Sequence, residues 1–236
     1  MELSEIKQIA IVGAGTMGSQ IAQLCSQIGK FSVTIMARRD TSINGAIQGI
    51  KESLKRYFVD KGKMKEEEMH EILGRIKGTT DLTEAVRNAD FVVESAAENM
   101  EVKKDLFKRI DGNVPSHAIL ASNTSSLNIT EMATATGRPG KVIGTHFFNP
   151  VGVMRAVEVV RGPLTSDETV DITAALLKKL GKEPLICKDY SYGFLAFRAY
   201  RAMVEEAVQM VWERVASPEE IDKALKLGYN LPMGPL

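Results

Sequence analysis

The sequence predicts an α/β protein: a Rossmann-type, doubly wound and mostly parallel sheet with an inserted helical hairpin, followed by an all-helical C-terminal domain. Three observations lead to this fold class. Short apolar runs alternate with helical patterns through residues 1–188, a glycine-rich turn joins the first run to the first helix, and only helical periodicity follows Phe194. We therefore expect a sheet domain over 1–188 and a helical domain over 189–236.

Apolar runs bounded by turn residues are typical of strands buried on both faces, and helical spacing between cap residues is typical of helices. The expected strands are 7–12, 31–36, 90–94, 118–121, 142–148, 156–160 and 184–187. The expected helices are 21–28, 81–86, 102–110, 127–135, 166–180, 195–215 and one beginning at 217.

Residues 41–76 depart from this alternation, because apolar side chains recur there at helical spacing in two stretches. The two stretches contain Ile47, Ile50, Leu54 and Phe58, then Met69, Ile72, Leu73 and Ile76. They predict an inserted helical hairpin. Five basic residues concentrate on it, namely Lys51, Lys55, Arg56, Lys61 and Lys63. A single lysine is usually part of a solvated face, but the group could attract an anionic part of a substrate.

The glycine-rich turn reads Gly-Ala-Gly-Thr-Met-Gly over residues 13–18 and lies between a strand and a helix, which is the context that a GxGxxG motif requires. Gly13 permits the tight turn, Gly15 lets the backbone approach a pyrophosphate, and Gly18 lets the helix pack on the strand. The N–H groups at the helix start then hold the phosphates, so the sequence predicts a dinucleotide site.

The composition restricts the class of protein. The 236 residues carry 30 basic and 30 acidic side chains, so no net charge attracts nucleic acid or a membrane surface. No apolar run reaches the ~20 residues of a membrane span, and no targeting peptide precedes the first strand. Cys25 and Cys187 lie in apolar runs, which favours buried thiols over a disulfide. We expect a cytoplasmic protein without nucleic-acid or membrane partners.

Three polar residues fall in or after expected strands, where doubly wound sheets gather functional groups. They are Ser125, His146 and Glu158. A histidine in an apolar strand is more often a core residue, but Glu158 would be costly to bury unpaired and could fix the tautomer of His146. Ser125 and Asn149 could hydrogen-bond a substrate oxygen. Neither a GxSxG elbow nor zinc-ligand spacing occurs, which argues against a serine hydrolase or a metal site.

The sequence resembles the L-3-hydroxyacyl-CoA dehydrogenase family over nearly its whole length. The resemblance is carried by the motifs at 13–18, 93–99 with Lys103, 122–126, 146–150 with Glu158, and 232–235. It implies oxidation of (S)-3-hydroxyacyl-CoA to 3-ketoacyl-CoA with NAD. The implied substrates are short-chain thioesters such as 3-hydroxybutyryl-CoA. It also implies a homodimer formed by the helical domain.

The resemblance implies roles for individual residues. His146 is the general base, Glu158 orients it, and Ser125 binds the substrate oxygen. The implied cofactor-binding residues are Gly13, Gly15, Thr16, Met17, Gly18, Glu98, Lys103 and Asn123. The basic residues of the hairpin would bind the phosphates of coenzyme A, and Arg56 and Lys61 are the candidates.

Two positions depart from the family pattern. The family usually ends its second strand with an aspartate for the adenosine ribose, whereas Ala37, Arg38 and Arg39 stand here, which would suit the 2′-phosphate of NADP. Phe197 replaces an asparagine that the family places near the substrate. Lowered activity, a shifted substrate or an engineered change would each explain it.

Two alternatives to the dehydrogenase stay open: a family member that binds cofactor with little or no catalysis, and a related reductase of a free hydroxy acid.

The two helices after residue 189 cannot close a core alone, so we expect this domain to be truncated or to pack on a partner chain.

Overall fold

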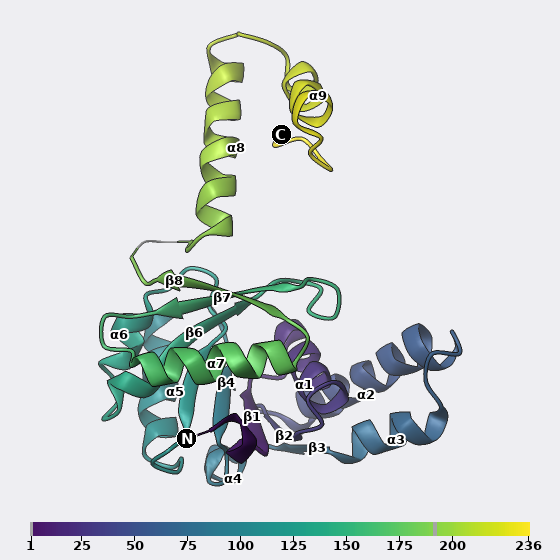
Figure 1. The fold of residues 1–236 in the computed structure, drawn as a ribbon, viewed down its shortest axis with the longest axis vertical. Coiled ribbons are helices and arrows are strands. Elements are labelled where there is room, and N and C mark those ends of the chain that lie inside the picture. Colours follow the sequence, from purple (N-terminus) through teal and green to yellow (C-terminus); the bar gives the residue numbers. More distant parts are fainter. Residues whose placement is uncertain (1, 191–192) are drawn as a thin grey trace. The chain divides into compact units, whose positions relative to one another are not determined.

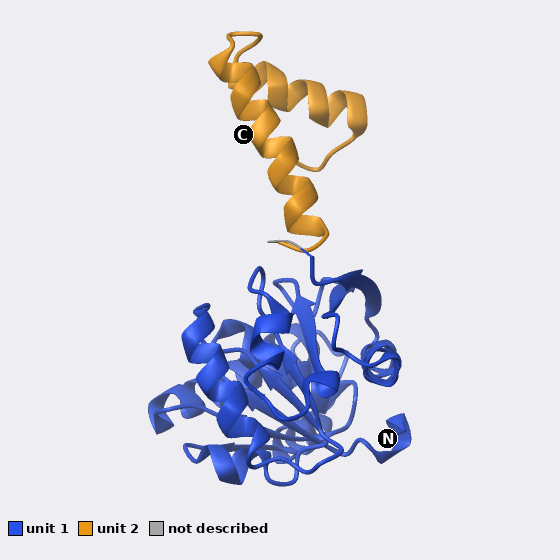
Figure 2. Cartoon of the chain, turned by 90° about the vertical axis from the view of Figure 1, so that its left-hand side faces the viewer, with its two compact units in different colours: residues 1–191 blue, residues 192–236 orange. Residues whose placement is uncertain are grey.

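A computed structural model describes residues 2–190 and 193–236, and the chain divides into two compact units, 1–191 and 192–236 (Figure 2). The first unit contains an eight-stranded sheet in the order β3-β2-β1-β4-β5-β6-β7-β8 (Figure 1). Its strands are β1 Gln8–Val12, β2 Ser32–Met36, β3 Ile76–Thr79, β4 Phe91–Glu94, β5 Ile119–Ser122, β6 Val142–Phe147, β7 Ala156–Arg161 and β8 Glu183–Lys188.

The strands β1 to β6 pair with one another in parallel and follow the doubly wound order. The strand order reverses between β1 and β4, and such a switch point leaves a crevice beyond the carboxyl ends of the strands. β7 is antiparallel to β6, and β8 is parallel to β7. The mostly parallel sheet and the helical C-terminal region confirm the predicted fold class.

Helices cover both faces of the sheet. α1 and α7 lie on one face, where their side chains meet those of β1, β4 and β6, whereas α4, α5 and α6 follow one another on the opposite face (Figure 1). The bounds are α1 Thr16–Gln27, α4 Leu82–Val86, α5 Met100–Asp111, α6 Ile129–Ala133 and α7 Asp167–Lys179. Burial on both faces explains why β1, β4 and β5 consist mostly of apolar residues, and β6 is buried throughout although it contains Thr145 and His146.

The inserted hairpin consists of α2 Asp40–Leu54, a π-helical turn Lys55–Val59 and α3 Glu66–Gly74. The expectation that Ile76 continues the second helix is wrong. Ile76 begins β3 and pairs with Val33 of β2 at the edge of the sheet. This strand has four residues, and Lys77 and Gly78 are exposed, so it has no apolar run by which the sequence could reveal it.

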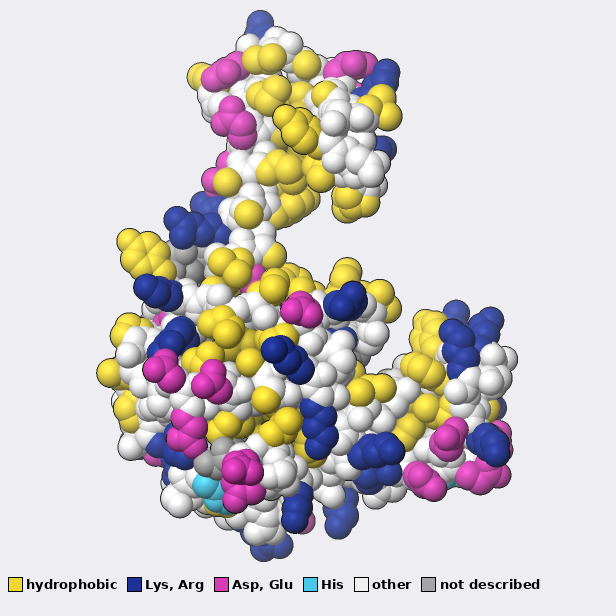
Figure 3. All heavy atoms as spheres, in the orientation of Figure 1, with side chains coloured by type: hydrophobic (Ala, Val, Ile, Leu, Met, Phe, Trp, Pro, Cys, Tyr) yellow, Lys and Arg dark blue, Asp and Glu magenta, His cyan; other side chains and the backbone are white. Residues whose placement is uncertain are grey.

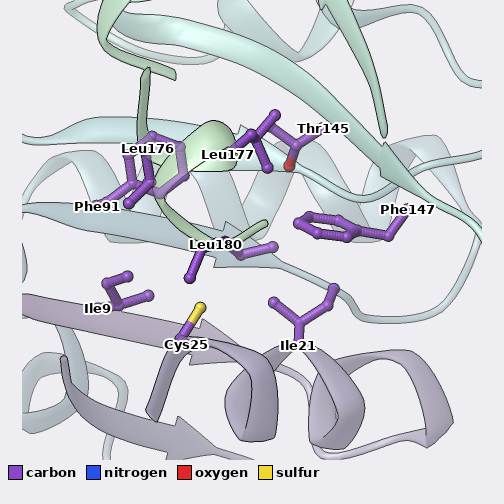
Figure 4. Close-up of a pocket in the computed structure, with 10 residues that line it drawn as sticks. Ile9, Ile21, Cys25, Phe91, Thr145, Phe147, Leu176, Leu177 and Leu180 are labelled. Atoms are coloured by element: carbon purple, nitrogen blue, oxygen red, sulfur yellow. The ribbon is translucent and has the colours of Figure 1, made fainter. Parts of the chain in front are cut away.

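The core between the sheet and the helices α1 and α7 is closely packed. An internal space between them has a volume of about 10 Å³, and apolar side chains line it apart from one hydroxyl, that of Thr145 (Figure 4). The Thr145 hydroxyl has no hydrogen-bond partner within residues 2–190 and 193–236. A water needs several polar partners, so this space is a packing defect rather than a ligand site.

The two cysteines are free thiols, but only one matches the expected burial. Cys25 lies in the core, where burial raises the pKa of its thiol to about 12. Cys187 is half-buried, because β8 forms the exposed edge of the sheet. Burial and the charge of Glu158 raise the pKa of Cys187 to about 11, so neither thiol is a thiolate at neutral pH.

The second unit contains α8 Ala196–Trp212 and α9 Pro218–Tyr229. The Ser217 hydroxyl accepts from the Glu220 N–H, and Pro218 occupies the first turn, as the sequence predicts. Few apolar side chains are buried within this unit, and Figure 3 shows many on its surface. The large exposed ones are Leu195, Phe197, Tyr200, Val208, Trp212, Val215, Leu227, Tyr229, Met233 and Leu236.

Among the described residues, the helices are too short or too polar to cross a bilayer.

Candidate active site

The glycine-rich turn follows β1 at the switch point and has the shape of a phosphate cradle. Gly13 has φ +126°, and a Cβ there would lie 2.3 Å from the carbonyl oxygen of Ser95, after β4. A Cβ on Gly18 would lie 1.9 Å from the oxygen of Gly13. Both positions therefore require glycine, as the motif predicts.

Gly15 is the N-cap of α1, and no side chain caps this helix. A Cβ on Gly15 would meet nothing within 4 Å, so the open space lies over the helix start. The N–H groups of Thr16, Met17 and Gly18 form its first turn, ahead of the first intrahelical bond, from Ser19 to Gly15. These donors suit a pyrophosphate, so the residues present fit a dinucleotide.

The ribose end of this cradle lies after β2. Ala37 is buried and donates its N–H to the carbonyl of Thr79, whereas Arg38 and Arg39 are exposed. Asp40 is the first residue of α2. The acidic residue typical of the end of this strand is therefore absent, and two exposed arginines follow Ala37 in the sequence.

A buried carboxylate, Glu94, lies at the end of β4. Its oxygens accept from Lys103 Nζ at 2.8 and 2.9 Å, from the Ser122 hydroxyl at 2.6 Å and from the Ala96 N–H at 2.6 Å. Glu94 is 0% and Lys103 1% exposed. Such an ion pair is tolerable in the interior because both oxygens and the ammonium are fully hydrogen-bonded.

Glu98 continues this cluster toward the surface. Lys103 Nζ lies 3.4 Å from its carboxylate, which also accepts from the Thr124 hydroxyl at 2.5 Å and from the Ser125 N–H at 3.0 Å. Burial raises the pKa of Glu98, but the hydrogen bond from Thr124 and the charge of Lys103 outweigh this effect and hold it below its ordinary value. Glu98 therefore fixes, as an anion, the loop that carries exposed Ser125.

His146 and Glu158 face each other across the antiparallel pair of β6 and β7. His146 Nδ1 lies 2.7 Å from Glu158 Oε2, with His146 8% and Glu158 0% exposed. A buried carboxylate at this distance favours the tautomer with a proton on Nδ1, whose lone pair is on Nε2. The ring of Phe148 packs against the imidazole, with the ring centroids 4.6 Å apart.

Two asparagines lie at the same edge. Asn123 accepts from the Phe147 N–H at 3.0 Å, and its amide nitrogen lies 3.5 Å from the Ser95 hydroxyl. Asn149 is exposed and accepts at 3.0 Å from Gln20 of α1. The register of the sheet aligns Val12, Glu94 and Ser122, the last residues of β1, β4 and β5, with Gly144 of β6, which continues three residues further to Phe147.

The other predicted substrate residues belong to the hairpin and to the second unit. Arg56 is in the π-helical turn, with its guanidinium carbon 5.6 Å from the centre of the Tyr57 ring, and it lines an open surface pocket of about 610 Å³. Lys61 follows in the exposed turn. Figure 3 shows basic side chains near the outer end of α2 and acidic ones over α3. Phe197 is in the first turn of α8, in the second unit, and is 43% exposed.

Three residues that contact the site were not predicted as functional: Glu94, Gln20 and Lys182. Glu94 reads as the polar end of an apolar strand, and its partner Lys103 is nine residues away. Gln20 and Lys182 contact the loop after β6 from segments about 130 and 30 residues distant along the chain. No spacing rule relates such residues, so their contacts follow from the tertiary fold.

The comparison with known proteins gives two matching family models. Residues 8–190 match the 3-hydroxyacyl-CoA dehydrogenase NAD binding domain, and residues 193–236 match the C-terminal domain of the same family.

Several known proteins align with most of this chain over most of their own length. A probable 3-hydroxybutyryl-CoA dehydrogenase of Bacillus subtilis is 47% identical over 98% of this chain and 79% of its own length. The 3-hydroxybutyryl-CoA dehydrogenase of Clostridioides difficile is 43% identical over 97% of this chain and 80% of its own. The crystal structure of (S)-3-hydroxybutyryl-CoA dehydrogenase from Ralstonia eutropha covers 98% of this chain and 81% of that one, with 44% identity and a TM-score of 0.93. The chain therefore belongs to the 3-hydroxyacyl-CoA dehydrogenase family and is an oxidoreductase.

Proposed function

We propose that this enzyme interconverts (S)-3-hydroxyacyl-CoA and 3-ketoacyl-CoA, with NAD as cofactor and short-chain substrates such as 3-hydroxybutyryl-CoA. The observation that carries this proposal is the buried His146–Glu158 pair at the carboxyl end of β6, with 2.7 Å between Nδ1 and the carboxylate. The names of the similar proteins support the substrate class.

In the direction of oxidation, His146 Nε2 accepts the proton of the C3 hydroxyl while the C3–H bond breaks and its electron pair leaves as hydride. Bound NAD supplies the acceptor of that hydride at its nicotinamide ring. Glu158 stabilises the imidazolium and keeps the ring oriented. Ser125 and Asn149 hydrogen-bond the substrate oxygen, and Glu98 holds the Ser125 loop in place. Lys103 acts toward the cofactor by fixing the carboxylates of Glu94 and Glu98.

The first prediction concerns the base. His146→Gln removes proton transfer, so kcat for reduction of acetoacetyl-CoA should fall about 10²- to 10⁴-fold while the Kd for NADH stays within twofold. Loss of NADH absorbance measures the rate, and fluorescence titration measures binding. His70→Gln, the same change on exposed α3, should keep wild-type turnover. A fully active His146→Gln enzyme would refute the mechanism.

The second prediction concerns the cofactor. The family match of residues 8–190 supports NAD, whereas Arg38 and Arg39 suit a 2′-phosphate. Parallel titrations should give tighter binding of NADH, and NADPH binding should depend on the arginines. Arg38→Ala should weaken NADPH about tenfold and NADH less than twofold. Arg109→Ala, on exposed α5, is the control. Equal weakening of both nucleotides would exclude recognition of the 2′-phosphate.

The third prediction concerns Phe197. We assign it to the substrate site, where the family asparagine would offer an amide. Phe197→Asn should raise kcat/KM for acetoacetyl-CoA about threefold to tenfold, the effect of one added hydrogen bond. Phe197→Leu removes bulk without adding a polar group, so it separates the effect of the lost bulk from that of the added hydrogen bond. No change in either variant would remove Phe197 from the substrate site.

A wild-type enzyme that binds NADH without turnover on any acyl-CoA would select the non-catalytic alternative.

The fourth prediction concerns coenzyme A. We assign Arg56 and Lys61 to its phosphates. Arg56→Ala should raise KM for acetoacetyl-CoA about threefold and leave KM for acetoacetyl-pantetheine, which lacks the nucleotide, unchanged. Glu52 and Asp60 line the same pocket and temper the attraction, so the effect is expected to be small. Equal effects on both thioesters would contradict the assignment.

The fifth prediction concerns assembly. Trp212 is 77% and Leu227 77% exposed, and such apolar surface on a two-helix unit supports a homodimer formed by these helices. Light scattering should give about twice the chain mass of 25.9 kDa. Trp212→Glu should shift the mass to that of one chain, whereas Tyr190→Glu, a matched change of an exposed aromatic residue in the first unit, should not. A wild-type monomer would contradict this proposal.

A further inference from the structure

One side chain, Gln20, connects the nucleotide-binding helix to the loop that follows the catalytic strand. Gln20 lies in α1, five residues after Gly15. Its carbonyl oxygen accepts from the Val151 N–H at 2.7 Å, and its amide nitrogen donates to Asn149 Oδ1 at 3.0 Å. Gln20 is therefore bound at both ends of its amide to the same loop.

The direction of these hydrogen bonds follows from the backbone. A peptide N–H can only donate, so the oxygen of Gln20 must face Val151. The nitrogen of Gln20 then faces Asn149, and the group that it meets must be the oxygen of Asn149. Because the oxygen of Asn149 faces Gln20, its NH₂ group points away from Gln20 and is a donor.

The loop has little freedom to reverse this arrangement. Val151 is buried, and the ammonium of Lys182 donates to the carbonyls of Val151 and, at 2.8 Å, of Met154. Burial lowers the pKa of Lys182. The N–H groups of Val153 and Met154 both bond to the carbonyl of Pro150. The backbone of Val151 is thus held by Lys182 at its carbonyl and by Gln20 at its N–H.

We propose that Gln20 is a positioning residue that orients Asn149 so that the active site offers an amide donor to a carbonyl oxygen of the acyl thioester. This inference rests on the proposed function, because the acceptor is an oxygen of the 3-ketoacyl-CoA. Asn149 lies two residues beyond β6 and is exposed, so its NH₂ group is available at the edge of the sheet that carries His146. Gln20 itself acts only through Asn149.

Gln20→Met tests this role, because methionine keeps the length of the side chain and has neither donor nor acceptor of comparable strength. We expect kcat/KM for acetoacetyl-CoA to fall about threefold to tenfold, since Asn149 loses its fixed orientation. The Kd for NADH should change less than twofold. Hydrogen exchange of the Val151 amide should accelerate. Gln23→Met is the control: Gln23 lies one turn later on α1 and bonds to Gln27.

The same substitution in an Asn149→Ala background shows whether Gln20 acts through Asn149. There Gln20→Met should change kcat/KM by less than twofold. An equal loss in both backgrounds, or full kcat/KM in Gln20→Met, would overturn the proposal. A wild-type enzyme that neither binds nor reduces acetoacetyl-CoA would refute the proposed function and this inference together, whereas an active wild type with an unaffected Gln20→Met variant would refute this inference alone.

Discussion

The active site depends on one cross-strand contact, the hydrogen bond between His146 and Glu158. Glu158 is fully buried, and a carboxylate there is tolerable only with a hydrogen-bonding partner. The antiparallel pairing of β6 and β7 sets the two residues directly opposite each other. A parallel β7, or a register shifted by one residue, would turn Glu158 away from His146. The reversal of strand direction in an otherwise parallel arrangement thus determines the chemistry.

The polar groups around this pair are oriented by hydrogen bonds from donors that the fold holds in place. Backbone N–H groups of Phe147 and Val151 fix the oxygen ends of Asn123 and, through Gln20, Asn149. Lys103, the Ser122 hydroxyl and the Ala96 N–H saturate Glu94. A site built in this way is preorganised, because little reorganisation is needed when charge develops on the substrate oxygen. Tight packing behind β6 keeps the strand in place, with a remaining void of about 10 Å³.

Much of the fold could be predicted from the sequence because local signals agree with one another. The run before Gly13, the glycine pattern and the helix after it each point to the same unit, and the structure confirms the glycine requirement at Gly13 and Gly18. The edge strand β3 escaped prediction because two of its four residues are exposed. Cys187 was expected to be buried, but β8 is an edge strand.

The sequence pattern identified His146 and Glu158 as candidates. It could not supply their register, since strand direction is set by tertiary packing. Glu94 lies within the motif at 93–99, but the motif does not show that Glu94 pairs with Lys103. Gln20 and Lys182 lie in no motif, so their contacts with the loop after β6 were not predictable.

The most direct test of this account is the tautomer of His146. The chain has three histidines, so ¹⁵N-histidine labelling with long-range ¹H–¹⁵N correlation spectra can resolve each ring, and His146→Gln assigns its signals. The pairing with Glu158 predicts that the neutral form of the ring carries its proton on Nδ1 and has its acceptor at Nε2, and it predicts that Glu158→Leu removes this preference. A neutral His146 with the proton on Nε2 would contradict the assignment of His146 as the proton acceptor.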